Sequence, residues 1–189
     1  MRSWINRQSL RTAVLCVGAV TMVGLAAPTT FGDTKEEKKA AEERNEERSE
    51  NRDFLKKAYQ AGLAEVEMGR LGREQASDEG VKKFAAMLVH DHEAANKEVE
   101  DIAEARHMTL TKKVTDTDDK THDRIAKLKG AEFDRAFIAA MVDAHVQAIK
   151  LFSDAQDTKD PKIDEFVKKT LPVLREHHAK AQALRDELK

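Results

Sequence analysis

The stretch that decides the fold is residues 133–152, FDRAFIAAMVDAHVQAIKLF. Its apolar residues recur at steps of three and four, which places them on one face of a long helix. His145 lies within that face, where an aliphatic residue is the default. The spacing therefore predicts an amphipathic helix that directs a titratable imidazole towards the core. The apolar residues of this stripe are Phe133, Phe137, Met141, Ala144, Ala148 and Phe152.

Three other segments repeat this arrangement, each with one polar residue in mid-helix. Glu65, His92 and His177 each interrupt an apolar stripe in the way that His145 does. Counted from the expected helix starts at a rise of about 1.5 Å per residue, the four residues lie at depths that agree within roughly 6 Å. Packed helices would therefore bring the four side chains into one layer. The expected helices cover residues 53–72, 78–102, 131–156 and 161–188.

Residues 107–130 break the helical pattern. Threonines are spread there among charged residues, with one short helical piece near 118–128. A connection of about 24 residues is far longer than the two to eight usual between neighbouring antiparallel helices. It is long enough to traverse the bundle, so that the third long helix runs parallel to the second. We therefore predict an all-α four-helix bundle with a long crossover, which is the topology of ferritin-like folds.

The first 27 residues have the pattern of an export signal. Arg2, Arg7 and Arg11 precede an uncharged, mostly apolar run at 12–25, which small residues such as Ala26 follow. The run is shorter than the roughly 18 to 20 residues of a membrane span, so we expect cleavage rather than an anchor. The expected product is an exported, periplasmic protein with no stable transmembrane span.

The remaining chain divides into a charged spacer at residues 28–52 and a helical domain at 53–189. Most of the spacer, DTKEEKKAAEERNEERSENR at 33–52, is charged or small and cannot bury an apolar face. We expect a solvated segment, partly helical through pairs of Glu with Lys or Arg, with a partner-binding arm as the alternative. Cys16 is the only cysteine and falls within the signal, so the exported chain has no disulfide and no cysteine ligand.

The composition excludes several classes of function. The chain has 33 Lys and Arg against 35 Asp and Glu, which leaves no basic excess for nucleic acid. Aromatic residues make up only 5%, so the core must be mainly aliphatic, as in helical bundles. No nucleophile elbow, phosphate loop or dinucleotide fingerprint is present, and a hydrolase is unsupported. An enzyme that uses a bound metal as an oxidant or Lewis acid stays open.

Glu65, His92, His145 and His177 together make a donor set for a transition metal. Imidazoles with a carboxylate suit Zn, Cu or Fe, and bundle cores are where facing helices build such sites. The alternative is a structural polar layer in which Glu65 pairs with the histidines, because a buried carboxylate without a donor or cation is costly.

Neighbouring residues add weaker candidates. Asp91 and Asp143 lie close enough in sequence to orient imidazoles as hydrogen-bond acceptors, although their angular offsets also suit solvent-facing positions. His178 is the alternate ligand on the last helix. Met68 and Met141 lie one turn from proposed ligands, where a thioether suits Cu(I) or simply fills the core. The histidines expected at the surface are His90, His107 and His122.

Four motifs of the chain resemble an exported bacterial family of ferritin-like proteins that is catalogued as a domain of unknown function. The resemblance covers about residues 53–188 and implies a four-helix ferritin-like fold and export, without an activity. The motifs are AEVEMGRLG at 64–72, FAAMLVHDHEAANKEV at 84–99, GAEFDRAFIAAMVDAHVQAIKLF at 130–152 and LPVLREH at 171–177.

One departure from the ferritin-like pattern limits the chemistry. Di-iron proteins of that class carry Glu-x-x-His pairs on two helices. Here Val89 and Leu174 stand three residues before His92 and His177, so the bridging carboxylates are absent. Any metal is therefore expected to be single and histidine-rich.

Our leading hypothesis is an exported domain that binds one transition metal, in envelope stress or metal handling. The rival is a non-catalytic envelope module, with a second copy of the chain or another envelope protein as partner.

Overall fold

The computed structural model describes residues 34–189, and all regular structure within them is helical. The prediction of an all-α chain is confirmed for these residues. The predicted signal at 1–27, with Cys16, lies outside the described residues, as does the beginning of the predicted spacer. The helices are α1 (Lys35–Gln75), α2 (Glu79–Glu104), α3 (Asp116–Ala126), α4 (Gly130–Asp154) and α5 (Pro161–Glu187).

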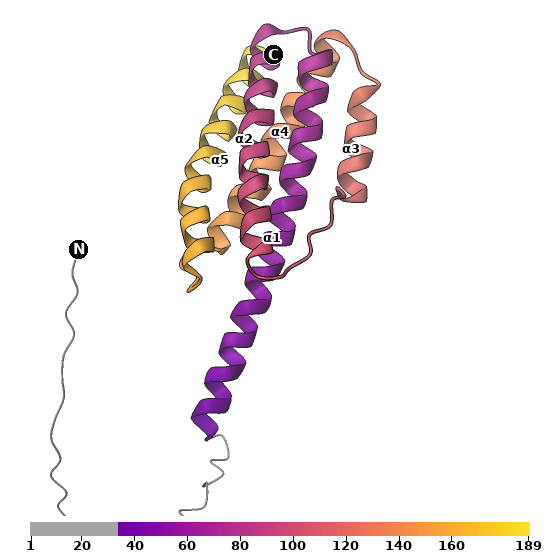
Figure 1. Cartoon of the computed structure of the whole chain (residues 1–189). Coiled ribbons are helices and arrows are strands. Elements are labelled where there is room, and N and C mark those ends of the chain that lie inside the picture. Colours follow the sequence, from indigo (N-terminus) through magenta and orange to yellow (C-terminus); the bar gives the residue numbers. More distant parts are fainter. Residues whose placement is uncertain (1–33) are drawn as a thin grey trace, which may run out of the picture.

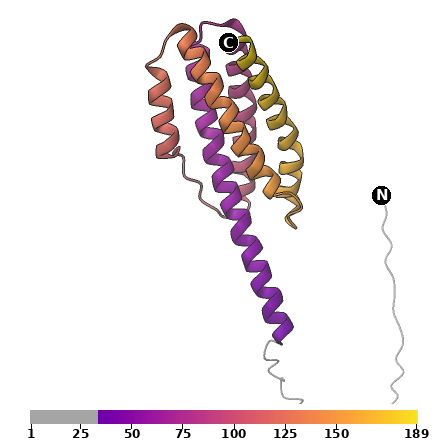
Figure 2. The same ribbon diagram turned by 180° about the vertical axis from the view of Figure 1, so that it is seen from behind.

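Four long helices pack side by side, and the short α3 lies against the outside of α1 and α4 (Figure 1). In the bundle, α1 and α5 each contact both α2 and α4. The chain rises along α1 and returns along α2. The connection that contains α3 then leads back up the bundle, so that α4 runs in the same direction as α2 before α5 returns (Figures 1 and 2).

Side-chain caps begin α2 and α5 at the expected positions. The Asp78 carboxylate accepts a hydrogen bond of 2.9 Å from the backbone N–H of Val81, at the start of α2. Asp160 accepts from the backbone N–H of Ile163, and the proline that follows Asp160 occupies the first turn of α5. These caps satisfy amides that have no partner inside the helix.

The first long helix begins much earlier than the sequence analysis predicted. Instead of starting at residue 53, α1 begins at Lys35, where Thr34 and Glu37 form a capping box, and it continues unbroken through the predicted spacer. Its N-terminal part projects beyond the other helices (Figure 1). Caps and Glu–Lys pairs sustain a helix without an apolar stripe. Residue 53 therefore marks where the bundle begins, just before buried Phe54, and not where the helix begins.

A polar layer divides the apolar core into two clusters. On every long helix the residues of one cluster precede the predicted site residue and those of the other follow it. On α1, for example, Phe54 and Tyr59 belong to one cluster, Met68 belongs to the other, and Glu65 lies between them. The two clusters fix the height and rotation of all four helices, and therefore the position of the layer.

Two polar contacts secure the opposite ends of the bundle. Buried Asp134 on α4 accepts hydrogen bonds from the backbone N–H groups of Ser77 and Asp78 and from the Ser77 hydroxyl. At the other end, the Arg106 guanidinium donates to both carboxylate oxygens of Asp160. These contacts join the start of α2 to α4 and the end of α2 to α5.

Of the described helices, α4 is the one whose length and hydropathy would suffice to cross a membrane. Its apolar stripe is nevertheless used inside the bundle, because Phe133, Phe137 and Ile138 are fully buried against the other helices. The outward side of α4 is rich in alanine and includes exposed Val146.

Candidate metal centre

The four predicted site residues lie in one buried layer, each contributed by a different long helix. The apolar clusters lie above and below this layer on all four long helices. The exposed fractions are 4% for Glu65, 7% for His92, 0% for His145 and 1% for His177.

The side chains converge on one another. The Oε2 atom of Glu65 lies 2.9 Å from Nε2 of His92 and 3.3 Å from Nε2 of His145. Each of the three histidines offers one ring nitrogen, and these three atoms lie within 4.8 Å of one another, so the group could hold a metal ion. The ring centroid of His177 lies 5.5 Å from the ring centroid of His92 and 5.3 Å from the ring centroid of His145.

Hydrogen bonds outside the layer fix the tautomers of two imidazoles. Nδ1 of His145 lies 2.8 Å from the carbonyl oxygen of Met141, which can only accept, so Nδ1 carries the proton and Nε2 presents a lone pair to the layer. Nε2 of His177 donates in the same way to the Asp91 carboxylate at 2.9 Å, which leaves Nδ1 unprotonated. Partners of this kind orient metal-binding histidines in proteins.

The atoms that face the centre lack hydrogen-bond partners. Glu65 Oε2, His92 Nε2, His145 Nε2 and His177 Nδ1 are all buried without a hydrogen bond of acceptable geometry within residues 34–189. The short distance between Glu65 and His145 brings two electron-rich atoms together, which is unfavourable unless a positive charge lies between them. Buried polar atoms without partners are rare and costly. A bound cation would satisfy the four atoms at once.

The electrostatics of the layer favour an ionised carboxylate. Burial alone would raise the pKa of Glu65, but the imidazoles of His92 and His145 outweigh burial and lower that pKa to about 2. Burial lowers the pKa of His145 and of His177 below its ordinary value, which keeps both rings neutral near pH 7. For His92, burial also favours the neutral form, but the adjacent Glu65 carboxylate raises the pKa overall.

The weaker candidates take different positions. Asp91 accepts a hydrogen bond from an imidazole, as proposed. The imidazole belongs to His177 on α5 and not to His92, the next residue on α2. Asp143 lies two residues before His145, so its side chain points about 200° away from that of His145 around the helix. It is exposed and makes no hydrogen bond to the four site residues. His178 is half-buried beside the layer and is not one of the three converging histidines.

The remaining histidines and methionines lie outside the layer. Met68 and Met141 are buried in the apolar cluster next to it. His90 and His107 are exposed, as expected, whereas His122 is half-buried on α3, contrary to the expectation.

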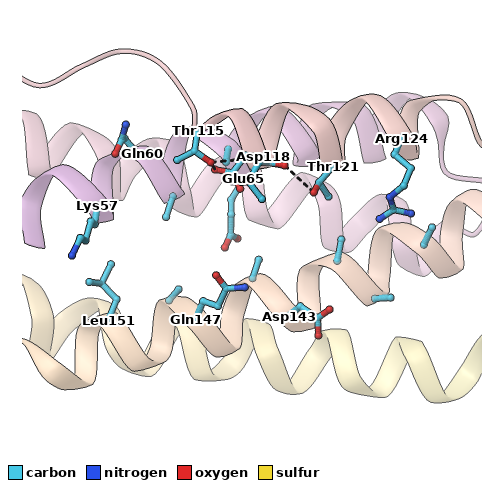
Figure 3. Close-up of a pocket in the computed structure, with 18 residues that line it drawn as sticks. Lys57, Gln60, Glu65, Thr115, Asp118, Thr121, Arg124, Asp143, Gln147 and Leu151 are labelled. Carbon is cyan, nitrogen blue, oxygen red and sulfur yellow. Dashed lines mark hydrogen bonds between the residues drawn. The ribbon is translucent and has the colours of Figure 1, made fainter.

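A groove between α1, α3 and α4 reaches the layer from outside (Figure 3). It has a volume of about 750 Å³, with an alanine-rich floor and polar residues around it. Glu65 lines this groove, and its side chain extends from α1 towards α4. None of the three histidines lines it, so Glu65 is the ligand candidate that separates the groove from the centre.

Sequence reasoning missed two polar residues beside the layer, Asn96 on α2 and Thr170 on α5. Both are buried and lie near Glu65 and His92. Asn96 follows His92 by four residues and Thr170 precedes His177 by seven, so both lie on the same helix faces as the histidines. That periodicity was the signal that could have revealed them.

These features define a helical bundle with a buried cluster of one glutamate and three histidines. The family model described as "Domain of unknown function (DUF4142)" matches residues 34–184, and the chain belongs to this family. No curated protein matches the chain. Among solved structures, the chain is similar to the crystal structure of a DUF305 fragment from Deinococcus radiodurans, with a TM-score of 0.67 and 10% identity. The match covers 73% of this chain and 96% of that one, and at this identity it shows the fold alone.

Proposed function

We propose that this protein is an exported, ferritin-like four-helix domain that binds a single transition-metal ion through Glu65, His92, His145 and His177. The observation that carries the proposal is the set of buried, unpartnered atoms that these residues turn towards one another. Two of the imidazoles are also held by outer hydrogen bonds in the tautomers that present lone pairs inward. A bound cation would satisfy these buried atoms, which are costly when they have no partner.

The donor set restricts the metal. Three imidazoles and one carboxylate suit Zn, Cu or Fe, whereas Mg and Ca prefer oxygen ligands throughout. The ionised Glu65 supplies one negative charge against a divalent ion, and the neutral histidines supply none. Because Val89 and Leu174 replace the carboxylates of a di-iron centre, one ion per chain is the proposed stoichiometry.

The proposed setting is the bacterial envelope, where the protein would bind metal during metal handling or stress. The support is the basic and apolar pattern of residues 1–27, which is typical of an export signal. The absence of a second cysteine is compatible with an oxidising compartment, because the domain needs no disulfide.

Elemental analysis of the untagged, exported protein tests the proposal. We expect about one equivalent of a transition metal per chain in the wild type, and less than about one tenth in His145→Ala, because loss of one of four ligands weakens a buried site severely. His122→Ala is the matched control, since it removes a histidine from α3 that lies outside the cluster. Sub-stoichiometric metal that His145→Ala leaves unchanged would refute the proposal.

A specific observation supports the alternative, a structural polar layer. The Glu65 carboxylate lies 2.9 Å from His92 Nε2, within range of an ion pair that needs no metal, and the raised pKa of His92 favours its charged form. In that case the domain would be a non-catalytic envelope module. It would be purified without metal, and its stability would be insensitive to chelators.

A further inference from the structure

A small, partly enclosed pocket, here called the chamber, lies directly beside the proposed metal centre. Its volume is about 20 Å³, which exceeds the roughly 10 to 15 Å³ needed for one water molecule. Glu65 and His92 line it on the side of the centre, and Asn96 and Thr170 line it as well. The rest of the wall is apolar and includes Phe152. The chamber is therefore a polar pocket of molecular size within an apolar core.

The two additional polar side chains have no partner within the described part of the protein. Asn96 is 8% exposed and Thr170 is 9% exposed, and neither side chain makes a hydrogen bond to another residue in 34–189. Buried amide and hydroxyl groups normally find partners. Because both groups line the chamber, they are placed to hydrogen-bond to a small molecule inside it.

Gly62 makes room for this arrangement. A Cβ atom at Gly62 would lie 2.1 Å from Oδ1 of Asn96, so any larger residue on α1 would displace the Asn96 side chain. The absence of a side chain at this position lets the buried amide lie directly against α1. The contact places the amide at the chamber and not at the protein surface.

A thin wall separates the chamber from the groove between α1, α3 and α4. Ala61, Glu65 and Ala148 line both spaces. Ala61 and Ala148 each have only a methyl group as side chain. Small movements are therefore enough to connect the groove with the chamber. Figure 3 shows Glu65 at the inner side of the groove, between α1 and α4.

We infer that the chamber is a binding site for a small ligand of the metal ion, such as water, hydroxide or an anion of two or three heavy atoms. The inference rests on the proposed metal centre. Zn held by four protein ligands expands to five-coordinate only in some sites, whereas Cu(II) and Fe take geometries with more than four ligands, so a further donor is most readily accepted by Cu or Fe. The Asn96 amide N–H and the Thr170 hydroxyl supply donors suited to an anion, and the apolar wall excludes larger molecules. The ligand reaches the chamber from the groove, past Ala61 and Ala148.

Exogenous-ligand titration of the cobalt-loaded full chain tests this inference, with cobalt content measured on the same samples. The visible absorption of Co(II) reports its coordination, so azide is expected to change the spectrum, whereas the bulkier imidazole is not. A spectrum that azide leaves unchanged at full cobalt content would overturn the inference and leave the metal proposal intact. A response to both ligands would overturn it too, because the chamber would then impose no size limit. Failure to bind cobalt would remove the metal proposal and the inference together.

Two variants test the route and the polar wall separately. Ala61→Leu should slow azide binding by about tenfold or more by thickening the wall, without loss of cobalt. Ala139→Leu is its control, because Ala139 lines the groove but not the chamber.

Thr170→Val, which keeps the shape and removes the hydroxyl, should weaken azide binding about tenfold. Azide rates and affinities that match the wild type in both Ala61→Leu and Thr170→Val would contradict the assigned chamber.

Discussion

At the scale of single residues, Asp91 determines how His177 can serve the centre. Its carboxylate accepts from His177 Nε2 at 2.9 Å, which holds the ring with Nδ1 facing inward and makes that nitrogen a better donor. We predict that Asp91→Asn lowers metal affinity by about tenfold to a hundredfold, because the amide keeps the shape and loses the charge. Competition with a coloured chelator measures this change.

Asp143→Asn provides the matched control for that substitution. It makes the same chemical change two residues from a proposed ligand, but its side chain is exposed and lines the groove. Equal losses of affinity in both variants would indicate a general effect of surface charge and would contradict the orienting role of Asp91.

The histidine layer also predicts an unusual pH dependence for the metal-free protein. The pKa of His145 and of His177 is lowered by burial, so folding favours their neutral forms, and stability falls as pH drops below the unfolded value of about 6.5. The pKa of His92 is raised by Glu65 despite burial, so its contribution is complete below about pH 6.5 and is lost as pH rises through the folded value. Stability should therefore peak near pH 6.5.

Denaturant unfolding in the presence of EDTA from pH 5 to 8.5 measures this profile. The acid side involves two residues and the alkaline side one, so the slopes are at most about 2.7 and 1.4 kcal/mol per pH unit. His92→Gln should abolish the alkaline decline and keep the acid one. A profile that is flat across this range in the wild type would contradict the buried titrations. Glu65 adds no slope here, because its contribution is lost only as pH falls from the unfolded value of about 4.5 through the folded pKa of about 2.

At the scale of helices, Asp134 joins the start of α4 to the turn between α1 and α2. It is 1% exposed and accepts from two backbone N–H groups and the Ser77 hydroxyl. We predict that Asp134→Ala destabilises the protein by about 2–4 kcal/mol, because three donors lose their acceptor in a buried position. Chemical denaturation measures the loss. Glu132→Ala, which removes an exposed acidic residue in the first turn of α4, should change stability by less than about 0.5 kcal/mol.

The helices of the bundle could be predicted because each carries an apolar stripe, and α2 and α5 also begin at identifiable caps. Asp78 and Asp160 begin α2 and α5 at the expected positions. The start of α1 could not be found in this way, because residues 35–52 form a helix without a buried face. A stripe reports where a helix packs, whereas caps and charge pairs decide how far it extends.

At the scale of the whole molecule, the converging layer could be predicted because the four polar residues interrupt stripes at matching depths. Their pairing with outer groups could not, since Asp91 on α2 meets His177 on α5 across a helix interface that one sequence does not specify. Asn96 and Thr170 were missed for a related reason. A single polar residue on an apolar face acquires meaning only when a neighbouring helix places a cavity beside it.

If one ion joins all four long helices, its removal should weaken the fold as a whole. A ligand present at about one hundred times its dissociation constant stabilises the native state by about 2.7 kcal/mol. For a domain of this size that corresponds to a change in melting temperature of about 5–10 °C. Calorimetry of the metal-loaded protein should show such a loss after EDTA treatment, and His145→Ala should melt at the same temperature with or without EDTA. A wild-type protein that carries about one metal ion and melts identically after the ion is removed would show that the ion does not bridge the helices. Because Glu65, His92, His145 and His177 lie on separate helices and between the two apolar clusters, an ion bound by all of them cannot leave the stability of the bundle unchanged.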